Sequence, residues 1–577
     1  MTSIFSDADS FVDEALAGFV LANSADVARV DGGIVRAQSL RPGQVAVVIG
    51  GGSGHYPAFA GYVGRGMAAG AVCGNIFTSP STGQAQRVAS AVENGGGVLF
   101  TFGKYAGDVI HFGEAQRRLR ADGIDARTVL ITDDVASAPE DDADERRGIA
   151  GILCVFRVAG SASERGDSID EVERLARLAN SRTRSHGVAF SGCTMPGAAD
   201  PLFTVPEGMM SIGLGIHGEP GVRDVPLQSA AELAVTLLDP LLRERPEGAS
   251  RAALIVNGLG TVKYEELFIL FGHVARELDK HGVAIVAPEC GELVTSLDMA
   301  GASVTLMWLD DELEELWTAP TSAPAFRRGV IESAAELEPT RETTSAAVDS
   351  PRAGRPAVAE GSRDAAALAR ELIRAARDAV RERVGELGDL DAIAGDGDHG
   401  IGMLRGLDAA LDHADRADES AGVEALLVGA GDAWSEAAGG TSGALWGAAL
   451  ASLGESLGDR EEYDASAVVK AISAARARIV ALGGAALGDK TMLDAILPFE
   501  EALETNLSGT GSLADALRLA ADAAELAAAG TEALSPRLGR ARPLAERSVG
   551  HPDPGAVSFS IIARNAVLAL DDRQKKE

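Results

Sequence analysis

The sequence VAVVIGGGSGHYPAFAGYVGRGM, residues 45–67, decides the fold of the first half of the chain. Its first five residues are apolar and predict a buried strand, and four glycines follow within the next five positions. Glycines at the end of a strand let backbone amides approach a ligand closely. Because His55 comes directly after them, the stretch predicts a strand that leads into a ligand-binding loop with a candidate catalytic side chain.

This loop does not match the dinucleotide-binding fingerprint. The fingerprint needs glycines at positions 1, 3 and 6, and counting from Gly50 the sixth residue is His55. GLGIHG at residues 213–218 has the right spacing, but Glu219 and Pro220 follow and would break the required helix. We therefore expect no dinucleotide site at either stretch.

Short apolar runs alternate with polar, helix-like stretches on both sides of this loop. The alternation predicts an α/β region with a largely parallel or mixed sheet, preceded by an amphipathic helix around residues 12–20. The other predicted strands are GVLFTF from Gly97, TVLIT from Thr128, GILCVF from Gly151, VAFSG from Val188, ALIVN from Ala253, VAIVAP from Val283 and SVTLMW from Ser303.

The composition changes after about residue 318, where Pro, Ala, Ser, Thr and Glu dominate and strand-like runs disappear. We interpret residues 336–361 as an interdomain linker between a domain of residues 1–335 and a domain of residues 362–577. In the second domain, Ala and Leu recur at helical spacing between Gly-rich breaks, so this domain is predicted to be all-α.

The charge and composition exclude several classes of protein. The 577 residues include 85 acidic and 52 basic side chains, a net charge of −33, and 46% are hydrophobic. Such an acidic, apolar-rich chain is globular and is expected to bind neither nucleic acid nor a membrane surface. No apolar run is long enough to span a membrane, and the acidic start does not resemble a secretion signal, so we expect a cytoplasmic protein. The four cysteines lack metal-ligand spacing and are expected to be buried thiols.

Three chemically active side chains follow predicted strands of the α/β region. His55 and His217 lie on Gly-rich loops, and Asp108 lies in GKYAGD after the strand from Gly97. Loops at the carboxyl ends of strands bind ligands in α/β sheets. A neutral imidazole can accept a proton or add to a carbonyl, and a nearby carboxylate can accept the proton of a hydroxyl group. A single histidine of this kind often only bonds a turn carbonyl, but three such residues together favour an active site.

The second domain contains LDAIAGDGDHG at residues 390–400, which brings Asp391, Asp396 and Asp398 close in sequence. Close carboxylates repel one another unless a cation lies among them, and hard oxygen ligands suit Mg²⁺. The calcium-loop pattern fails, and a solvated acidic turn explains less well the Gly-rich turns that follow. These turns can bind phosphates at helix starts and are GGTSG (439–443), GDKTMLD (488–494) and ERSVGHPDPG (546–555). Together they indicate a site for a magnesium-bound nucleotide.

With these motifs the chain resembles the ATP-dependent dihydroxyacetone kinases, in which a ketose-binding DhaK-type domain is fused to a nucleotide-binding DhaL-type domain. The resemblance covers nearly everything except the linker. It implies two α/β subdomains with mixed sheets, followed by a closed barrel of about eight helices with a lid near the nucleotide. It also implies Mg²⁺ and ATP as cofactor and co-substrate, a small ketose as acceptor, and a homodimer in which domains can be shared across chains.

The resemblance further implies a role for each site residue. His217 corresponds to the histidine that forms a covalent hemiaminal with the ketose, and His55 and Asp108 correspond to an acid/base pair. The predicted substrate-binding residues are Gly52, Ser53, Gly54, Tyr56, Gly103 and Lys104. The predicted metal ligands are Asp391, Asp396 and Asp398. The predicted nucleotide-binding residues are Asp398, His399, Gly400, Ile401, Thr441, Ser442, Gly483, Thr491, Met492, Asp553, Pro554 and Gly555.

Four positions beside the ketose site depart from the family pattern. Tyr56 and Phe59 replace a carboxylate and an imidazole, and Gly103 and Lys104 replace Lys and Asn. A missing side chain at Gly103 would open space, and Tyr56 could bind an extra hydroxyl, so we expect erythrulose as substrate, with the D enantiomer favoured. The alternatives are dihydroxyacetone as substrate, a ketose-sensing regulator without turnover, and an enzyme that splits FAD to a cyclic product.

Overall fold

The computed structural model divides the chain into two compact units, Met1–Ser350 and Pro351–Glu577, and the division falls inside the predicted linker. No helix among the described residues is long and apolar enough to cross a membrane. The structure describes residues 4–574 except Pro220, residues 331–357, Asp396, Glu419, Gly511, residues 539–541 and residues 543–544.

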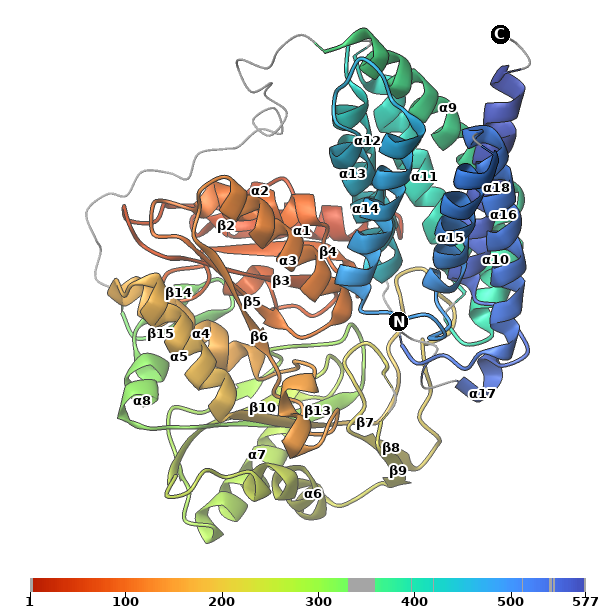
Figure 1. Cartoon of the computed structure of the whole chain (residues 1–577). Helices are drawn as coiled ribbons and strands as arrows, with labels where there is room; N and C mark the ends of the chain where they lie inside the picture. Colours follow the sequence, from red (N-terminus) through yellow and green to blue (C-terminus); the bar gives the residue numbers. More distant parts are fainter. Residues whose placement is uncertain are drawn as a thin grey trace. The chain divides into compact units, whose positions relative to one another are not determined.

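The first unit contains two mixed sheets, as the alternating pattern predicted (Figure 1). In the six-stranded sheet, with order β1-β2-β4-β3-β5-β6, strands β4, β3, β5 and β6 run parallel, and β1 and β2 form an antiparallel edge. Its strands are β1 (Val27–Val30), β2 (Gly33–Arg36), β3 (Ala46–Ser53), β4 (Gly70–Ile76), β5 (Val98–Gly103) and β6 (Ala126–Ile131). Strand β3 is the predicted strand and lies in the middle of the sheet, but it continues to Ser53, so that three of the four glycines expected in the loop belong to the strand.

The second sheet has the order β11-β10-β13-β7-β8-β9, with β12 also paired to β10. It is mainly antiparallel, and only β11 and β12 pair in parallel with β10. Its strands are β7 (Thr183–Ala189), β8 (Met209–Ile212), β9 (Arg223–Pro226), β10 (Arg251–Gly258), β11 (Ala284–Ile285), β12 (Glu289–Gly291) and β13 (Gly301–Trp308).

Helices cover both faces of each sheet. Helices α2 and α3 pack on one face of the first sheet, α4 and α5 fill the space between the sheets, and α6 and α7 cover the outer face of the second sheet. The helices of this unit are α1 (Phe11–Ala22), α2 (Thr82–Val92), α3 (Ala106–Ala121), α4 (Ile152–Arg165), α5 (Ile169–Arg182), α6 (Ala230–Arg243), α7 (Tyr264–Lys280) and α8 (Asp311–Thr318), with short 3₁₀ turns η1 (Ala60–Tyr62) and η2 (Glu140–Glu145).

Helix α4 corrects one sequence prediction. The run GILCVF from Gly151 was expected to be a strand, but its residues begin α4, in which every residue from Ile152 to Ser163 is buried. The run GILCVF is apolar throughout and too short to show a helical period, so by itself it cannot be told from a buried strand. The other predicted runs contribute to β5, β6, β7, β10, β11 and β13.

A small hairpin corrects a second prediction. Strands β14 (Thr321–Ala323) and β15 (Phe326–Arg328) pair antiparallel in a region where we expected no strand. Ala323 and Phe326 are buried, and the Arg328 guanidinium lies over the Trp317 ring at 4.8 Å from its centroid. These tertiary contacts stabilise strands that the polar, proline-containing sequence does not indicate.

The described part of the second unit is all-α, as predicted. Helices α9, α11, α12, α13, α14, α15, α16 and α18 pack each against the next, and α18 packs against α9, so that they close a ring. The helices are α9 (Glu360–Glu382), α10 (Val384–Ala392), α11 (His399–Arg416), α12 (Val423–Ala438), α13 (Gly440–Leu457), α14 (Ala465–Gly483), α15 (Leu493–Thr510), α16 (Leu513–Gly530), α17 (Ala545–Ser548) and α18 (Pro554–Gln574), with the 3₁₀ turn η4 (Thr531–Ala533).

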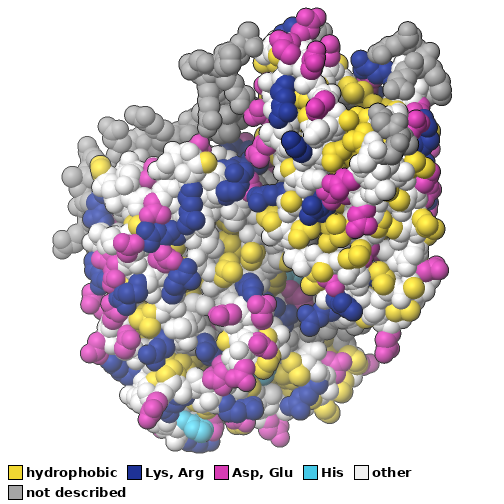
Figure 2. Space-filling view, in the orientation of Figure 1, with side chains coloured by type: hydrophobic (Ala, Val, Ile, Leu, Met, Phe, Trp, Pro, Cys, Tyr) yellow, Lys and Arg dark blue, Asp and Glu magenta, His cyan; other side chains and the backbone are white. Residues whose placement is uncertain are grey.

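Acidic and basic side chains are mixed on the surface, and most of the cysteines are buried. Figure 2 shows basic side chains scattered among the acidic ones on the face in view. Cys73, Cys154 and Cys193 are buried, as predicted, whereas Cys290 is partly exposed. Burial raises the pKa of Cys73 to about 12, so this thiol stays protonated and unreactive at neutral pH.

Candidate active site

Two histidines from distant parts of the chain meet beyond the carboxyl end of β3. His55 follows β3, and His217 lies in the loop after β8. Their Nε2 atoms lie 2.9 Å apart, and Nδ1 of His55 lies 2.7 Å from the carbonyl oxygen of Thr295. His55 is 2% exposed, whereas 21% of the His217 side chain is exposed. The pair therefore combines a buried ring with a ring that a ligand can reach.

The hydrogen-bond partners of the two rings show where their protons lie. The Thr295 carbonyl and the Glu219 carboxylate only accept hydrogen bonds, so Nδ1 of each ring carries a proton. The contact between the two Nε2 atoms needs a third proton. Burial, and then the neighbouring His217 ring, lower the pKa of His55 to about 3, so the His55 ring is neutral at neutral pH.

Glu219 and Arg147 support the pair, and the sequence analysis missed both as site residues. Oε1 of Glu219 accepts a hydrogen bond from Nδ1 of His217 at 3.0 Å, and Oε2 accepts one from the His217 backbone N–H at 3.0 Å. Nη1 of Arg147 lies 3.8 Å from Oε2, and its Nε donates to Asp134 at 2.7 Å. Burial alone would raise the pKa of Glu219, but His217 and Arg147 more than offset this and hold it well below its usual value. The glutamate two residues after His217 was the available signal.

Aromatic rings enclose the histidine pair. The Phe77 ring stacks on His55 at 5.0 Å between centroids, and its centroid lies 5.2 Å from that of His217 in a T-shaped contact. The Tyr105 ring meets His217 at 4.8 Å, and its hydroxyl donates to the Gly148 carbonyl at 3.0 Å. These two rings form apolar walls beside the histidine pair. Neither ring was among the predicted site residues, although Tyr105 belongs to the quoted motif GKYAGD.

Asp108 lies in the first turn of α3 and not in the loop before it. It is 6% exposed, and its Oδ1 has no hydrogen-bond partner among the described residues. Burial raises its pKa to about 7, although the Ser79 side chain and then His217 act in the opposite direction. A buried carboxyl that titrates near neutral pH can accept or donate a proton, as the acid/base prediction requires.

The predicted substrate loop lies against the loop after β4. A Cβ atom at Gly52 would lie 2.7 Å from the Thr78 backbone nitrogen, and one at Gly54 would lie 2.9 Å from the Phe77 ring. Ser53 Oγ donates to the Gly74 carbonyl at 2.7 Å. The glycines are therefore needed for close packing of the end of β3 against the loop after β4.

The positions that depart from the family pattern have other contacts. A Cβ atom at Gly103 would lie 3.1 Å from the Gly148 carbonyl oxygen and 3.2 Å from the Tyr105 ring, so the expectation that Gly103 opens space is wrong. Lys104 Nζ donates to the Asp144 carbonyl at 2.7 Å. Tyr56 is 55% exposed, and its ring packs on Phe19 of α1. None of these three contacts involves the histidine pair.

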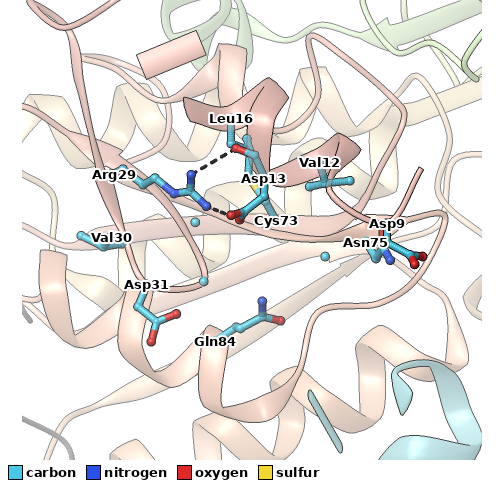
Figure 3. A pocket seen from close by; sticks show the side chains of 13 residues that line it. Asp9, Val12, Asp13, Leu16, Arg29, Val30, Asp31, Cys73, Asn75 and Gln84 are labelled. Carbon is cyan, nitrogen blue, oxygen red and sulfur yellow. Dashed lines mark hydrogen bonds and ion pairs between the residues drawn. The ribbon is translucent and has the colours of Figure 1, made fainter. Parts of the chain in front are cut away.

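A separate cavity of about 720 Å³ lies beside α1 and the β1–β2 hairpin (Figure 3). Asp9, Asp13 and Asp31 line it, and Arg29 pairs with Asp13 across its wall. The cavity reaches Gly74, the residue that accepts the Ser53 hydrogen bond, but no predicted site residue lines it. It therefore lies behind the substrate loop and outside the histidine site.

In the second unit, the acidic turn joins α10 to α11. Oδ2 of Asp391 accepts hydrogen bonds from the backbone N–H groups of Gly397, Asp398 and His399, at 2.9, 3.1 and 3.4 Å. Burial, and then the nearby Asp391, raise the pKa of Asp398. Asp396 lies outside the described residues, and the described residues alone form no group of three metal ligands. The repulsion between Asp391 and Asp398 is of the kind that a bound cation relieves.

The start of α11 packs against the start of α18. His399 Nε2 bonds Ser558 Oγ at 3.1 Å, and Ser558 Oγ donates to the Gly555 carbonyl at 2.9 Å. The Ser558 hydroxyl must therefore accept from His399, so Nε2 of His399 carries the proton. Gly400 has no room for a side chain because Val384 lies against it, and Ile401 is 52% exposed.

The turn before α15 meets the same end of α18. A Cβ atom at Gly555 would lie 3.4 Å from Met492 Cβ. Asp553 Oδ1 accepts a hydrogen bond from the Ala556 N–H at 2.8 Å. Burial raises the pKa of Asp553 to about 7, although the hydrogen bond from Ala556 acts in the opposite direction. The starts of α11, α15 and α18 thus converge, and Asp391, Asp494 and Asp553 each accept hydrogen bonds from backbone N–H groups there. Helix starts of this kind favour negatively charged groups such as phosphates. The predicted residues at this junction are His399, Gly400, Ile401, Thr491, Met492, Asp553, Pro554 and Gly555.

Lys490 and Asp494 also belong to this junction, although the sequence analysis did not select them. Lys490 Nζ donates to the carbonyls of Leu534 and Ser548, at 3.1 and 2.6 Å. Asp494 accepts from the Thr491 N–H at 2.8 Å. Both side chains therefore hold the backbone of the predicted nucleotide-binding turn.

The remaining predicted nucleotide residues lie on α13 and α14. Thr441 and Ser442 are exposed in the first turn of α13, and Gly483 ends α14. A Cβ atom at Gly483 would lie 3.5 Å from Leu445 of α13, so the two helices meet there. In the described part of the unit, no hydrogen bond joins these residues to the acidic turn.

Known proteins have the same two-part organisation. A Dak1 domain matches residues 17–325, and a DAK2 domain matches residues 393–567. The chain is 51% identical to an L-erythrulose kinase of Pectobacterium atrosepticum, over 99% of this chain and 97% of the relative. It is 52% identical to a D-erythrulose kinase of Mycolicibacterium smegmatis, over 98% of each chain. The chain therefore belongs to the dihydroxyacetone kinase family, as its motifs indicated.

A solved structure supports the same conclusion. The dihydroxyacetone kinase from C. freundii, in complex with AMP-PNP and Mg²⁺, covers 99% of both chains with a TM-score of 0.53 and 29% sequence identity. Its match extends over the α/β unit and the helical unit, so the predicted fold class is confirmed for both.

Proposed function

We propose that this protein is an ATP-dependent erythrulose kinase, which transfers the γ-phosphoryl group of Mg-ATP to a terminal hydroxyl of the ketose. Two full-length relatives at 51% and 52% identity are erythrulose kinases, one for each enantiomer. The structural observation that carries the ketose chemistry is the His55–His217 pair, whose Nε2 atoms lie 2.9 Å apart and whose His217 side chain is 21% exposed.

The ketose is held by a bond to His217. On substrate arrival, the proton between the two rings moves to Nε2 of His55, and the freed lone pair on Nε2 of His217 attacks the carbonyl carbon. The C=O π electrons pass to the oxygen, which takes the proton from His55. The product is a neutral hemiaminal hydroxyl on a carbon bonded to a cationic imidazole. A polyol has no carbonyl and cannot react in this way, so the bond selects ketoses over glycerol.

Asp108 activates the terminal hydroxyl. Its buried carboxyl has a pKa of about 7 and an Oδ1 without a described partner, so it is ready to accept the hydroxyl proton as the new O–P bond forms. Positioning of the two reactants supplies most of the remaining catalysis in phosphoryl transfer.

The nucleotide binds in the helical unit. Asp391 and Asp398, with Asp396, would hold Mg²⁺, and the converging helix starts would bind the phosphates through backbone N–H groups. When bound, the metal neutralises charge on the transferred group. The C. freundii relative in complex with AMP-PNP and Mg²⁺ supports this assignment.

A coupled ADP-release assay with Mg-ATP tests the proposal. We compare D-erythrulose, L-erythrulose, dihydroxyacetone and glycerol, and expect an erythrulose to have the highest kcat/KM and glycerol to give no turnover. A higher kcat/KM with dihydroxyacetone than with either erythrulose would make dihydroxyacetone the preferred substrate. Absence of ketose-stimulated ADP release would reject the kinase assignment. FAD is assayed in parallel, because its consumption without ketose would indicate the cyclase alternative.

The assembly is a further proposal. The resemblance implies a homodimer, so light scattering of the full-length protein should give about twice the chain mass of 59.3 kDa. A mass equal to one chain would reject it.

A further inference from the structure

We propose that Glu219 is a positioning residue for the covalent step: it holds His217 in the tautomer that leaves Nε2 free to react, and it balances the positive charge of the adduct. Arg147 fixes the carboxylate in place. This inference deepens the proposed function and rests on it.

The Glu219 carboxylate accepts two hydrogen bonds, and both come from His217. Its Oε1 accepts from Nδ1 of His217 and its Oε2 from the His217 backbone N–H, both at 3.0 Å. The carboxylate also fills the space where a side chain at residue 215 would lie, so Gly215 is required for this arrangement. With two bonds to one residue, the carboxylate can rotate only by breaking one of them.

The tautomer follows from these bonds. A carboxylate cannot donate, so Nδ1 must carry the proton whenever the bond is present. In the neutral ring the lone pair then lies on Nε2, the atom that faces His55. Without the carboxylate, the proton could move to Nε2 and block the nucleophile.

Charge balance gives the second part of the role. When Nε2 bonds the carbonyl carbon while Nδ1 keeps its proton, the ring becomes a cation. The groups facing the His217 ring are His55, Phe77, Tyr105 and Glu219, and among described residues Glu219 is the only acid that bonds it. Asp108 acts on His217 only through space. The Glu219 carboxylate is therefore the counterion of the adduct.

Arg147 links this carboxylate to the first sheet. Its Nη2 donates to the Gly213 carbonyl at 2.9 Å, and its Nε donates to Asp134, which follows β6, at 2.7 Å. These two hydrogen bonds fix the Arg147 guanidinium so that its Nη1 lies 3.8 Å from Oε2 of Glu219. The guanidinium thus prevents the carboxylate from turning away from His217.

The test compares Glu219→Gln with Glu219→Asp and with the exposed control Glu207→Gln. A glutamine has one acceptor and one NH₂ group in place of two acceptors, so it cannot satisfy both N–H groups of His217. We expect its amide to donate to Nδ1 and drive the ring proton to Nε2. Aspartate keeps the charge and should keep the tautomer. Arg147→Gln serves as a second variant that leaves the carboxylate intact but loosens it.

Two readouts are taken on the full-length protein. The first is ¹⁵N NMR of histidine-labelled protein without ketose, with the His217 signals assigned by comparison with His217→Ala. The second is ¹³C NMR of the adduct with ketose labelled at the carbonyl carbon, without ATP. Glu219→Gln should move the His217 proton to Nε2 and weaken adduct formation by about 10- to 100-fold, the effect of one charge-assisted hydrogen bond. Arg147→Gln should weaken it less, and Glu219→Asp should restore most of it.

The inference would be overturned if Glu219→Gln kept the wild-type His217 tautomer and formed the adduct as well as the wild-type protein does. It would also be overturned if Glu207→Gln weakened adduct formation as much as Glu219→Gln does. If the glutamine variant does not fold, an unchanged adduct in Arg147→Gln would overturn it. If the wild-type protein forms no adduct with any ketose, the covalent part of the proposed function fails. The ketose-free ¹⁵N spectra then still decide the tautomer role of Glu219.

Discussion

Nε2 of His55 lies 2.9 Å from Nε2 of His217, although 162 residues separate the two in the chain. Each ring also bonds a group that only accepts protons, so the pair holds three protons when its contacts are complete. The two neighbouring Nε2 atoms can therefore carry out proton transfer and covalent attack. Both histidines belong to the first unit, so the ketose site and the helical unit can be tested with separate variants.

His217→Ala removes the nucleophile of the ketose site. We expect kcat/KM for the ketose to fall by about 10³-fold or more, because the covalent step has no substitute. Binding of AMP-PNP with Mg²⁺ should not change, since the nucleotide residues belong to the other unit. Calorimetry measures this binding, and His273→Ala on α7 is the matched control. Retained ketose turnover would contradict the role of His217.

The pKa of Asp108 predicts how the ketose reaction depends on pH. Its pKa of about 7 means that the carboxyl is protonated at lower pH and cannot accept a proton there. kcat/KM for the ketose should therefore rise through about pH 7 and level above it. Asp108→Asn should remove this limb and lower the plateau by about 10²- to 10⁴-fold. The exposed Asp224→Asn should retain the full profile. A limb that persists in Asp108→Asn would assign it to another group.

Gly103→Ala tests the wall beside His217. The new methyl group would press on the Gly148 carbonyl and on the Tyr105 ring, whose centroid lies 4.8 Å from that of His217. Overpacking of this kind costs about 1–3 kcal/mol, so we expect KM for the ketose to rise several-fold while KM for ATP stays the same. Gly113→Ala is the control, because nothing lies within 4 Å of its Cβ position. A lower KM for erythrulose in Gly103→Ala would contradict this prediction, because it would show that Gly148 and Tyr105 can move to accommodate the methyl group.

Asp553 predicts a pH-dependent stability of the helical unit. Burial raises its pKa to about 7, above its value in the unfolded chain, so the folded state binds the proton more tightly. Stability should therefore fall as the pH rises from about 4 to 7 and stay lower above that. Asp553→Asn can still accept from the Ala556 N–H, and it should raise the unfolding free energy above pH 7 by up to about 4 kcal/mol, with no gain below pH 4. Denaturant unfolding at pH 4.5 and 8 measures this, with Asp412→Asn as control, and equal gains at both pH values would contradict it.

The sequence by itself determined the α/β and all-α classes, strand β3 with its Gly-rich loop, and the candidate residues His55, Asp108 and His217. These features depend on local chemistry, because apolar periodicity, glycine conformation and side-chain type are visible over a few positions. The same reasoning failed for α4, which is buried on all sides, and for β14 and β15, which are stabilised by contacts with distant residues.

Only the tertiary structure decided which side chains work together. It brought His55 to His217, placed Glu219 and Arg147 behind them, and filled the space beside Gly103 with Tyr105 and Gly148. These relationships depend on distances between residues far apart in the chain. A local pattern carries no information about such distances, so it could name the reactive residues but not the neighbours that set their protons and charges.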